Sequence, residues 1–268
     1  MPAANGDGES DLTYRILTGP GEPVVCLPGG PLLTTRYLGN LGGLDEFRKL
    51  VMFELPRRRI DEVVSDLETL RSDLGLRKLD ILAHSASGNL AMLYAAAHPD
   101  RIGKLALVTP SLRAVGIQPT AEEFFASIER RSKEVWYVKA RRALDAVEAG
   151  DDSPENNLAA AAFQYGRWDE EAQRHAAGVS EEVIAGAATI FYAEGAFDVP
   201  ATTAELARLD AEVLIVVGEE DFVLTRSRGE QLAKLFPRAT MVVQEGAGHY
   251  PWVDSATEFV SIASPFFV

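Results

Sequence analysis

The sequence predicts an α/β fold with a mostly parallel central sheet, flanked by helices and interrupted by a helical insertion. From Leu12 onward, short β-type runs alternate with longer stretches of helical periodicity, a pattern typical of parallel strands joined by crossover helices. Several short runs are almost continuously apolar, as expected for strands covered on both faces. The alternation stops between Pro110 and Asp210, where Ala- and Glu-rich helical stretches contain no convincing strand. We therefore expect one sheet-based core and one inserted group of helices.

The same patterns assign individual elements. A helix is predicted over residues 60–74, because apolar side chains recur there at i, i+3, i+4 and i+7 and Gly75 follows as a stop signal. Residues 150–157 combine Gly, Asp, Ser, Pro and Asn, which predicts a loop between two helices of the insertion. The strand candidates are residues 12–17, 23–27, 50–54, 79–83, 105–108, 213–217 and 240–244.

These elements divide the chain of 268 residues into two parts. The α/β core is expected over residues 12–110 and 204–268, and the helical insertion over residues 111–203. Hydrophobic residues make up 47% of the sequence and charged residues 25%, the balance of a globular protein that buries a sizeable interior.

Charge and composition exclude several classes of partner. The net charge of −14 repels phosphate groups at long range, so neither nucleic acid nor an anionic membrane is an expected partner. No stretch approaches the ~20 apolar residues that a membrane helix needs, and residues 1–11 lack the apolar centre of a signal peptide. A cytoplasmic location is therefore the default expectation.

The residues that usually hold metals and cofactors give no pattern. The four histidines are scattered and Cys26, the one cysteine, lies in an apolar run, so no spacing typical of metal ligands exists. No nucleotide-binding loop is recognisable either. We expect neither a metal nor a cofactor.

The first chemical signal is a sharp turn between a strand and a helix. The strand candidate ending at Ala83 runs into Ser85, and a helical pattern over residues 89–96 follows at once. A nucleophile at the apex of such a turn needs small residues two positions before and after it. Ala83 and Ser87 meet this requirement around Ser85, in place of the usual glycines.

Two alternatives remain at this turn. Centring it on Ser87 would put Asn89 where a small residue is needed, which favours Ser85 as the nucleophile. Either serine could instead cap the following helix, by accepting hydrogen bonds from the free amides of its first turn.

A serine nucleophile needs a base and an acid that orients the base. After the strand at 213–217, an acidic loop ends in Asp221, the predicted acid, with Glu219 and Glu220 as competitors. After the last strand candidate, a loop of small residues presents His249, the predicted base. The chain order serine, aspartate, histidine matches the order known for this kind of turn.

The other histidines do not follow a late strand. His84 flanks the turn, His98 precedes a proline at a helix end, and His175 lies in the insertion. His249 is therefore the preferred base.

An oxyanion that forms during acyl transfer needs two backbone donors. The amide after the nucleophile, here that of Ala86, is one. The second is expected from residues 28–31, Pro-Gly-Gly-Pro after an early strand, where glycine lets the backbone approach a substrate closely. We assign Gly30, with Gly29 as the alternate. A plain tight turn is the other interpretation of this segment.

With these segments in place, the sequence resembles the α/β-hydrolase superfamily, and most closely its proline iminopeptidase-like branch. The resemblance rests on residues 27–31, the turn around Ser85, residues 218–221 and Gly248-His249, and it extends over nearly the whole chain outside the insertion. It implies that the insertion is a helical cap over the site and sets the choice of substrate.

The sequence departs from the branch at three points. Pro28 stands where the oxyanion loop usually begins with histidine, and a stretch of the form Arg-Gly-x-Gly-x-Ser is missing after residues 50–54. No position can be matched to the acidic residues with which iminopeptidases hold the amino terminus of a substrate.

The predicted function is a serine hydrolase that cleaves an ester, thioester or amide bond, including that of an N-terminal prolyl peptide. Its substrate would be a small molecule or a short peptide. Two alternatives use the same fold: a cofactor-free acyltransferase or other enzyme of natural-product metabolism, and a ligand-binding homologue with an idle site. The oligomeric state is not predicted.

Overall fold

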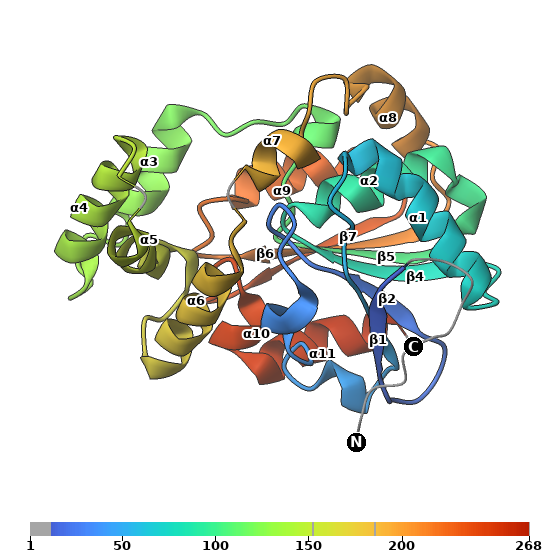
Figure 1. Ribbon diagram of the computed structural model, residues 1–268, viewed down its shortest axis with the longest axis horizontal. Coiled ribbons are helices and arrows are strands. Elements are labelled where there is room, and N and C mark those ends of the chain that lie inside the picture. The colour runs from blue at the N-terminus through green and yellow to red at the C-terminus, as the bar shows by residue number, and fades with distance from the viewer. Residues whose placement is uncertain (1–11, 152, 185, 268) are drawn as a thin grey trace.

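The computed structural model describes residues 12–151, 153–184 and 186–267, so residues 1–11 lie outside it. Its strands form one seven-stranded sheet in the order β1-β3-β2-β4-β5-β6-β7 (Figure 1). β1 pairs antiparallel with β3 at one edge, and the other neighbours are parallel. The strands are β1 (Tyr14–Leu17), β2 (Val24–Leu27), β3 (Leu50–Phe53), β4 (Leu79–His84), β5 (Ile102–Val108), β6 (Glu212–Gly218) and β7 (Ala239–Gln244).

The predicted fold class is confirmed, and every strand candidate overlaps an observed strand. The largest difference is β5, which begins at Ile102 rather than at residue 105. Gly103 and Lys104 interrupt the apolar pattern there. The amide of Lys104 nevertheless donates to Asp80 Oδ1 at 2.9 Å, which holds the first residues of β5 against β4.

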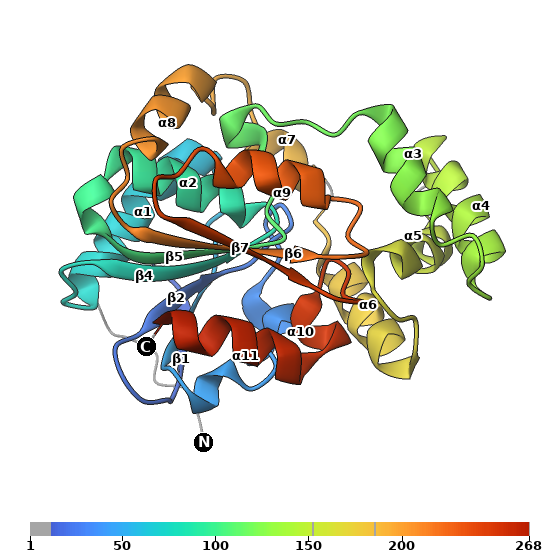
Figure 2. The same cartoon turned by 180° about the vertical axis from the view of Figure 1, so that it is seen from behind.

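Helices cover both faces of the sheet (Figures 1 and 2). On one face, side chains of α1, α2, α8 and α9 pack against the strands in a single hydrophobic cluster. On the opposite face, α10, α11 and the 3₁₀ helix η1 form a second cluster with the strands. These helices are α1 (Ile60–Asp73), α2 (Ser87–Ala97), α8 (Val199–Leu206), α9 (Arg226–Ala233), α10 (Pro251–Asp254), α11 (Ala256–Phe267) and η1 (Thr35–Leu38).

The segment between β5 and β6 is helical throughout its described elements. It holds α3 (Ala121–Glu129), α4 (Tyr137–Glu148), α5 (Pro154–Ala160), α6 (Glu170–Glu182) and α7 (Ala187–Phe191), before α8 returns to the core. α3, α4 and α5 extend away from the sheet at one side of the molecule (Figure 1). Short 3₁₀ helices complete the chain: η2 (Leu44–Glu46), η3 (Pro99–Arg101), η4 (Arg113–Val115) and η5 (Ala161–Gln164).

One expectation within this segment is wrong. The predicted loop at 150–157 ends early, because α5 begins at Pro154. The side chain of Ser153 accepts a hydrogen bond from the amide of Asn156, and Pro154 fits the first helical position. The polar residues that predicted a loop are thus the start signal of a helix.

None of the helices in the described ranges is long and apolar enough to cross a membrane.

The sheet register brings the ends of the central strands to one edge. Leu27 pairs with Ala83, His84 with Val108, and Val108 with Val216. Since β2, β4, β5 and β6 are parallel, the loops that follow them leave the sheet side by side. Polar residues at the carboxyl ends of such strands are placed to form a site.

Candidate active site

Ser85 occupies the apex of the turn between β4 and α2. Its φ of 51° lies in the left-handed region, which is costly for a residue other than glycine and persists only where its surroundings hold it. The amide of Ser85 donates to the carbonyl of Val108 at 3.1 Å, and the carbonyl of Ser85 accepts from the amides of Gly88 and Ser111, each at 2.9 Å. Neighbouring strand, helix and loop therefore fix this backbone.

The structure gives Ser87 a different contact. Its hydroxyl donates to the carbonyl of Pro28, in the loop after β2. The residue that precedes α2 is Ala86, and no side chain caps this helix end within the described chain. Neither serine acts as a helix cap here, and the hydroxyl of Ser87 is already engaged.

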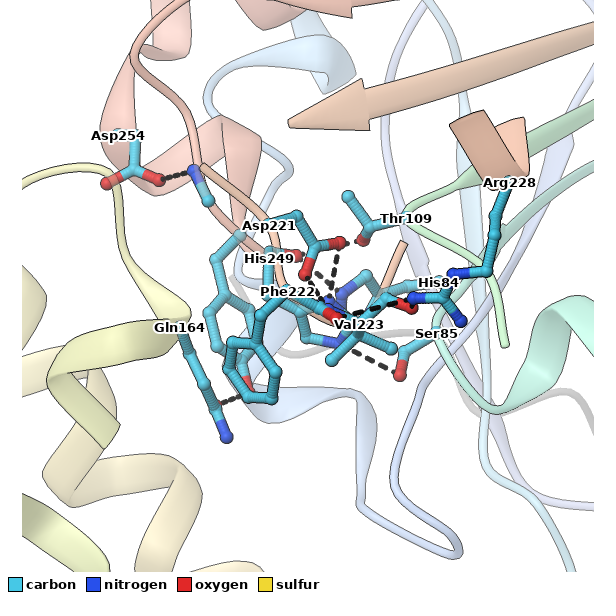
Figure 3. Close-up of polar contacts among 12 residues, drawn as sticks. His84, Ser85, Thr109, Gln164, Asp221, Phe222, Val223, Arg228, His249 and Asp254 are labelled. Carbon is cyan, nitrogen blue, oxygen red and sulfur yellow. Dashed lines mark hydrogen bonds and ion pairs between the residues drawn. The ribbon is translucent and has the colours of Figure 1, made fainter. Parts of the chain in front are cut away.

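Three predicted residues from three loops form one hydrogen-bonded series (Figure 3). His249 Nε2 lies 2.9 Å from Ser85 Oγ, and His249 Nδ1 lies 3.1 Å from Asp221 Oδ2. All three side chains are buried, with Ser85 the most exposed at 9%. Because the carboxylate can only accept, the proton between them belongs on Nδ1, which leaves the lone pair of Nε2 facing the serine hydroxyl. This arrangement can draw the proton from Ser85.

The contacts of the acidic loop distinguish Asp221 from Glu219 and Glu220. Asp221 Oδ1 accepts from the amide of Val223 at 2.8 Å, which turns the other oxygen toward His249. Glu219 accepts from the amide of Gly246 at 2.9 Å, and Glu220 lies 3.7 Å from Arg130 of the insertion. Both glutamates therefore point to other partners.

The backbone of His249 is held from several sides. Its amide donates to the carbonyl of Gln164 at 2.7 Å. Its carbonyl accepts from Thr109 Oγ1 and from His84 Nε2, both at 2.9 Å. The preceding amide, of Gly248, donates to Asp254 Oδ2 at 2.7 Å. Sequence reasoning missed these supports. Thr109 directly follows β5, a position that could have singled it out, whereas Gln164 and Asp254 carry no such signal.

The glycine pair lies against the turn. A Cβ atom on Gly29 would come within 2.9 Å of both Ser85 Cβ and His84 Nδ1, so this backbone can approach only as glycine. The amide of Gly29 donates to the hydroxyl of Tyr37. In the described chain, the amides of Gly30 and Ala86 donate no hydrogen bond to protein. The amides of Gly30 and Ala86, the two predicted oxyanion donors, are therefore available, whereas the amide of Gly29 is already bonded to Tyr37.

Burial controls the electrostatics around these loops. It lowers the pKa of His84 well below its ordinary value, with the nearby His249 adding to the effect. It also raises the pKa of Asp254, whose hydrogen bonds with backbone amides partly oppose the shift. Arg228 is buried under the Asp221 loop, where its guanidinium donates to the carbonyls of Phe222 and Val223 and desolvation lowers its pKa.

The histidines at 175 and 98 take no part in this series. His175 contacts the hydroxyl of Tyr165 at 2.8 Å and the carbonyl of Tyr37 at 2.9 Å. The ring of His98 lies tilted against that of Tyr94 at the end of α2, with 5.1 Å between the ring centroids. Across the described ranges, no group of three or more His, Cys, Asp or Glu residues could hold a metal ion.

Two known proteins are similar to this chain over nearly its whole length. The chain is 25% identical over 267 residues to the AB hydrolase superfamily protein YclE of Bacillus subtilis, covering 93% of this chain and 92% of the relative. It is 21% identical over 271 residues to a proline iminopeptidase of Heyndrickxia coagulans, covering 92% and 91%.

Solved structures share the fold. A proline iminopeptidase of Mycobacterium smegmatis matches with a TM-score of 0.71 and 20% identity, over 98% of this chain and 96% of that one. An esterase of Exiguobacterium antarcticum matches with a TM-score of 0.69 and 19% identity, over 99% and 98%. The family model described as alpha/beta hydrolase fold matches residues 31–256, most of the length of the chain. The chain therefore belongs to the alpha/beta hydrolase family.

Proposed function

We propose that this protein is a serine hydrolase in which Ser85 is the nucleophile, His249 the base and Asp221 the acid that orients the base. The observation that carries the proposal is the buried series of hydrogen bonds from Asp221 through His249 to Ser85, at 3.1 and 2.9 Å. A serine held at positive φ at the end of a central strand supports the same role.

The chemistry follows from these positions. His249 Nε2 takes the proton of Ser85 as Oγ attacks the acyl carbonyl, and the Asp221 carboxylate stabilises the imidazolium that forms. The amides of Ala86 and Gly30 would stabilise the oxyanion. His249 then gives the proton to the leaving alkoxide, thiolate or amine. Water, deprotonated by the same histidine, releases the acyl group and restores Ser85.

We also propose that the helices of the insertion act as a cap that binds part of the substrate. A cavity of about 580 Å³ lies among α4, α5 and α6, a size suited to a small organic group. Gln164 and Tyr165 border this cavity, and the carbonyl of Gln164 accepts from the amide of His249. One residue that borders the cavity therefore contacts the backbone of the proposed base. Small and apolar side chains form much of its wall: Val147, Gly150, Pro154, Ala161, Ala176, Val179 and Val183.

The substrate class is tested by a panel of p-nitrophenyl esters of graded length with prolyl and alanyl naphthylamides. Wild type and Ser85→Ala are assayed side by side. Cleavage of prolyl amides that depends on Ser85 would make the protein an iminopeptidase, and cleavage of esters alone an esterase. Ser85→Ala should lower turnover by at least about 10⁴-fold. An undiminished rate in this variant would overturn the assignment of the nucleophile.

A further inference from the structure

Tyr37 and His84 form a buried pair beside the proposed site but take no part in its chemistry. Tyr37 belongs to η1 and is 6% exposed, and His84 ends β4 and is 2% exposed. The hydroxyl of Tyr37 lies 2.7 Å from His84 Nδ1 and accepts the amide of Gly29. On the other side of the ring, His84 Nε2 lies 2.9 Å from the carbonyl oxygen of His249. The pair thus joins the glycine loop to the base.

The partners fix where each proton lies. A carbonyl oxygen can only accept, so His84 carries its proton on Nε2 and donates it to His249. Burial, with His249 and His175 nearby, keeps the pKa of His84 well below its ordinary value, so the ring is neutral and Nδ1 has a free lone pair. The hydroxyl of Tyr37, whose pKa burial raises, must then donate to Nδ1. Its oxygen is left to accept from Gly29.

The resulting series runs in one direction. The Gly29 amide donates to Tyr37, Tyr37 donates to His84, and His84 donates to the carbonyl of His249. Reversal of any member would set two donors or two lone pairs against each other. His84 is also the residue directly before Ser85. The series therefore touches the loop with the proposed oxyanion donor, the turn with the nucleophile, and the backbone of the base.

We propose that Tyr37 and His84 are positioning residues, which hold the glycine loop and the backbone of His249 in register around Ser85. This inference rests on the proposed function. The carbonyl of His249 fixes the proton of His84 on Nε2, and the hydroxyl of Tyr37 satisfies Nδ1. The ring held in this way fixes the position of the His249 backbone relative to Ser85. Thr109 Oγ1 supplies a second donor to the same carbonyl, so loss of the pair weakens the arrangement without abolishing it.

The pair can be tested without displacing the ring of Tyr37. The carbonyl of Tyr37 is held by His175 of α6 at 2.9 Å, and the ring packs against His84, Tyr250 and Trp252. Tyr37→Phe therefore removes one hydroxyl and keeps the packing. Tyr94→Phe is the matched control, because it removes another buried tyrosine hydroxyl, bonded to Glu68 at 2.9 Å.

The readout is the second-order rate of labelling of Ser85 by a fluorophosphonate, measured with kcat and KM for one ester. Loss of a direct oxyanion donor lowers kcat by about 10²–10³-fold, and Tyr37 acts one contact further away. We therefore expect Tyr37→Phe to lower labelling and kcat by about 10-fold, with KM little changed. Tyr94→Phe should leave the rate intact. His84→Gln, which keeps a side-chain donor for the carbonyl of His249, should retain more activity than His84→Leu.

NMR spectroscopy separates a positioning role of the pair from a mere packing role. In ¹⁵N-labelled protein, His84 should show the neutral Nε2–H form. Tyr37→Phe should keep this tautomer and shift the Nδ1 resonance, because Nδ1 loses its hydrogen bond. Equal labelling rates for wild type and Tyr37→Phe, or a His84 ring protonated on Nδ1 in wild type, would overturn the inference alone. A wild-type protein that is not labelled at all would overturn the proposed function and this inference with it.

Discussion

The carboxyl edge of the sheet and the outer helices of the insertion are built in contrasting ways. At the sheet edge, each proposed catalytic residue has at least two fixed contacts, and the carbonyl of His249 alone accepts from both Thr109 and His84. The outer helices share a small hydrophobic cluster around Ile128 and Phe163, which Phe222 of the Asp221 loop also contacts. They also leave apolar residues such as Val135 and Val138 exposed, at 101% and 60%.

The contrast indicates a division of labour. A site that stabilises a developing charge must hold its groups to within fractions of an ångström. A sheet edge whose residues each have two or more fixed contacts can do so. Residues of the outer helices that contact neither the Asp221 loop nor His249 can change without disturbing that edge. We expect substitutions at the sheet edge to change kcat and substitutions in the insertion to change KM.

The largest effect is expected at the acid. Asp221→Asn keeps the shape of the side chain but replaces the carboxylate that orients Nδ1–H, so kcat should fall by about 10³–10⁴-fold. Glu220→Gln, in the same loop but directed toward Arg130, is the matched control and should change kcat by less than about 3-fold. Steady-state kinetics on a cleaved ester measures both. The assignment fails if the two variants lose activity equally.

The next effect concerns the glycine loop. Gly29→Ala would place a Cβ atom 2.9 Å from Ser85 Cβ, so the loop must move and kcat should fall by about 10²-fold. Gly178→Ala in α6 meets no atom within 4 Å, and alanine is the better helix former by up to about 1 kcal/mol. This control should leave kcat unchanged and slightly raise the melting temperature. Equal kcat for wild type and Gly29→Ala would contradict the close approach.

A smaller effect on stability is expected at acid pH. Burial lowers the pKa of His84 in the folded chain, whereas the unfolded chain protonates this histidine below its ordinary pKa of about 6.5. The unfolded state then binds more protons, so the stabilising contribution is present above pH 6.5 and is lost as the pH falls. Between pH 6.5 and 5.5 the loss should be about 1 kcal/mol.

Urea unfolding of wild type and His84→Gln at both pH values measures this contribution. The glutamine variant should lose less free energy of unfolding than wild type over that interval. A loss of the same size in the two proteins would show that His84 does not titrate on unfolding.

The smallest effect is expected in the cavity of the insertion. Ser180 borders it, and Ser180→Phe should raise KM for long-chain esters several-fold, about 1 kcal/mol of lost binding, and leave acetyl esters and kcat unchanged. Arg174→Phe, on the exposed side of the same helix, is the control. A fall in kcat for all esters would break the division between the two regions.

Much of the site could be predicted from sequence because its residues sit at fixed places in a regular pattern. Ser85, Asp221 and His249 each follow a strand whose apolar run is visible, and parallel strands bring their carboxyl ends together. The roles proposed for these residues stay predictions until they are tested. The supports at Tyr37 and Gln164 could not be predicted, since each lies in a short 3₁₀ helix, distant in sequence from the residue it contacts, and acts through a single hydrogen bond.

The error at 150–157 has a similar physical origin. Ser153 and Pro154 are common both in loops and at the first turn of a helix, and composition alone does not separate the two. Only the hydrogen bond from the Asn156 amide to Ser153 decides between them. The signals at a helix cap depend on contacts that composition does not contain.

The most direct test of the central claim is the site of covalent labelling by a fluorophosphonate, mapped by mass spectrometry in wild type and in His249→Gln. A serine reacts rapidly only when a base activates it. We predict a single adduct on Ser85 in wild type and labelling slowed by at least about 10³-fold in His249→Gln. An adduct on Ser87, or a Ser85 adduct that forms equally fast without the histidine, would contradict the account.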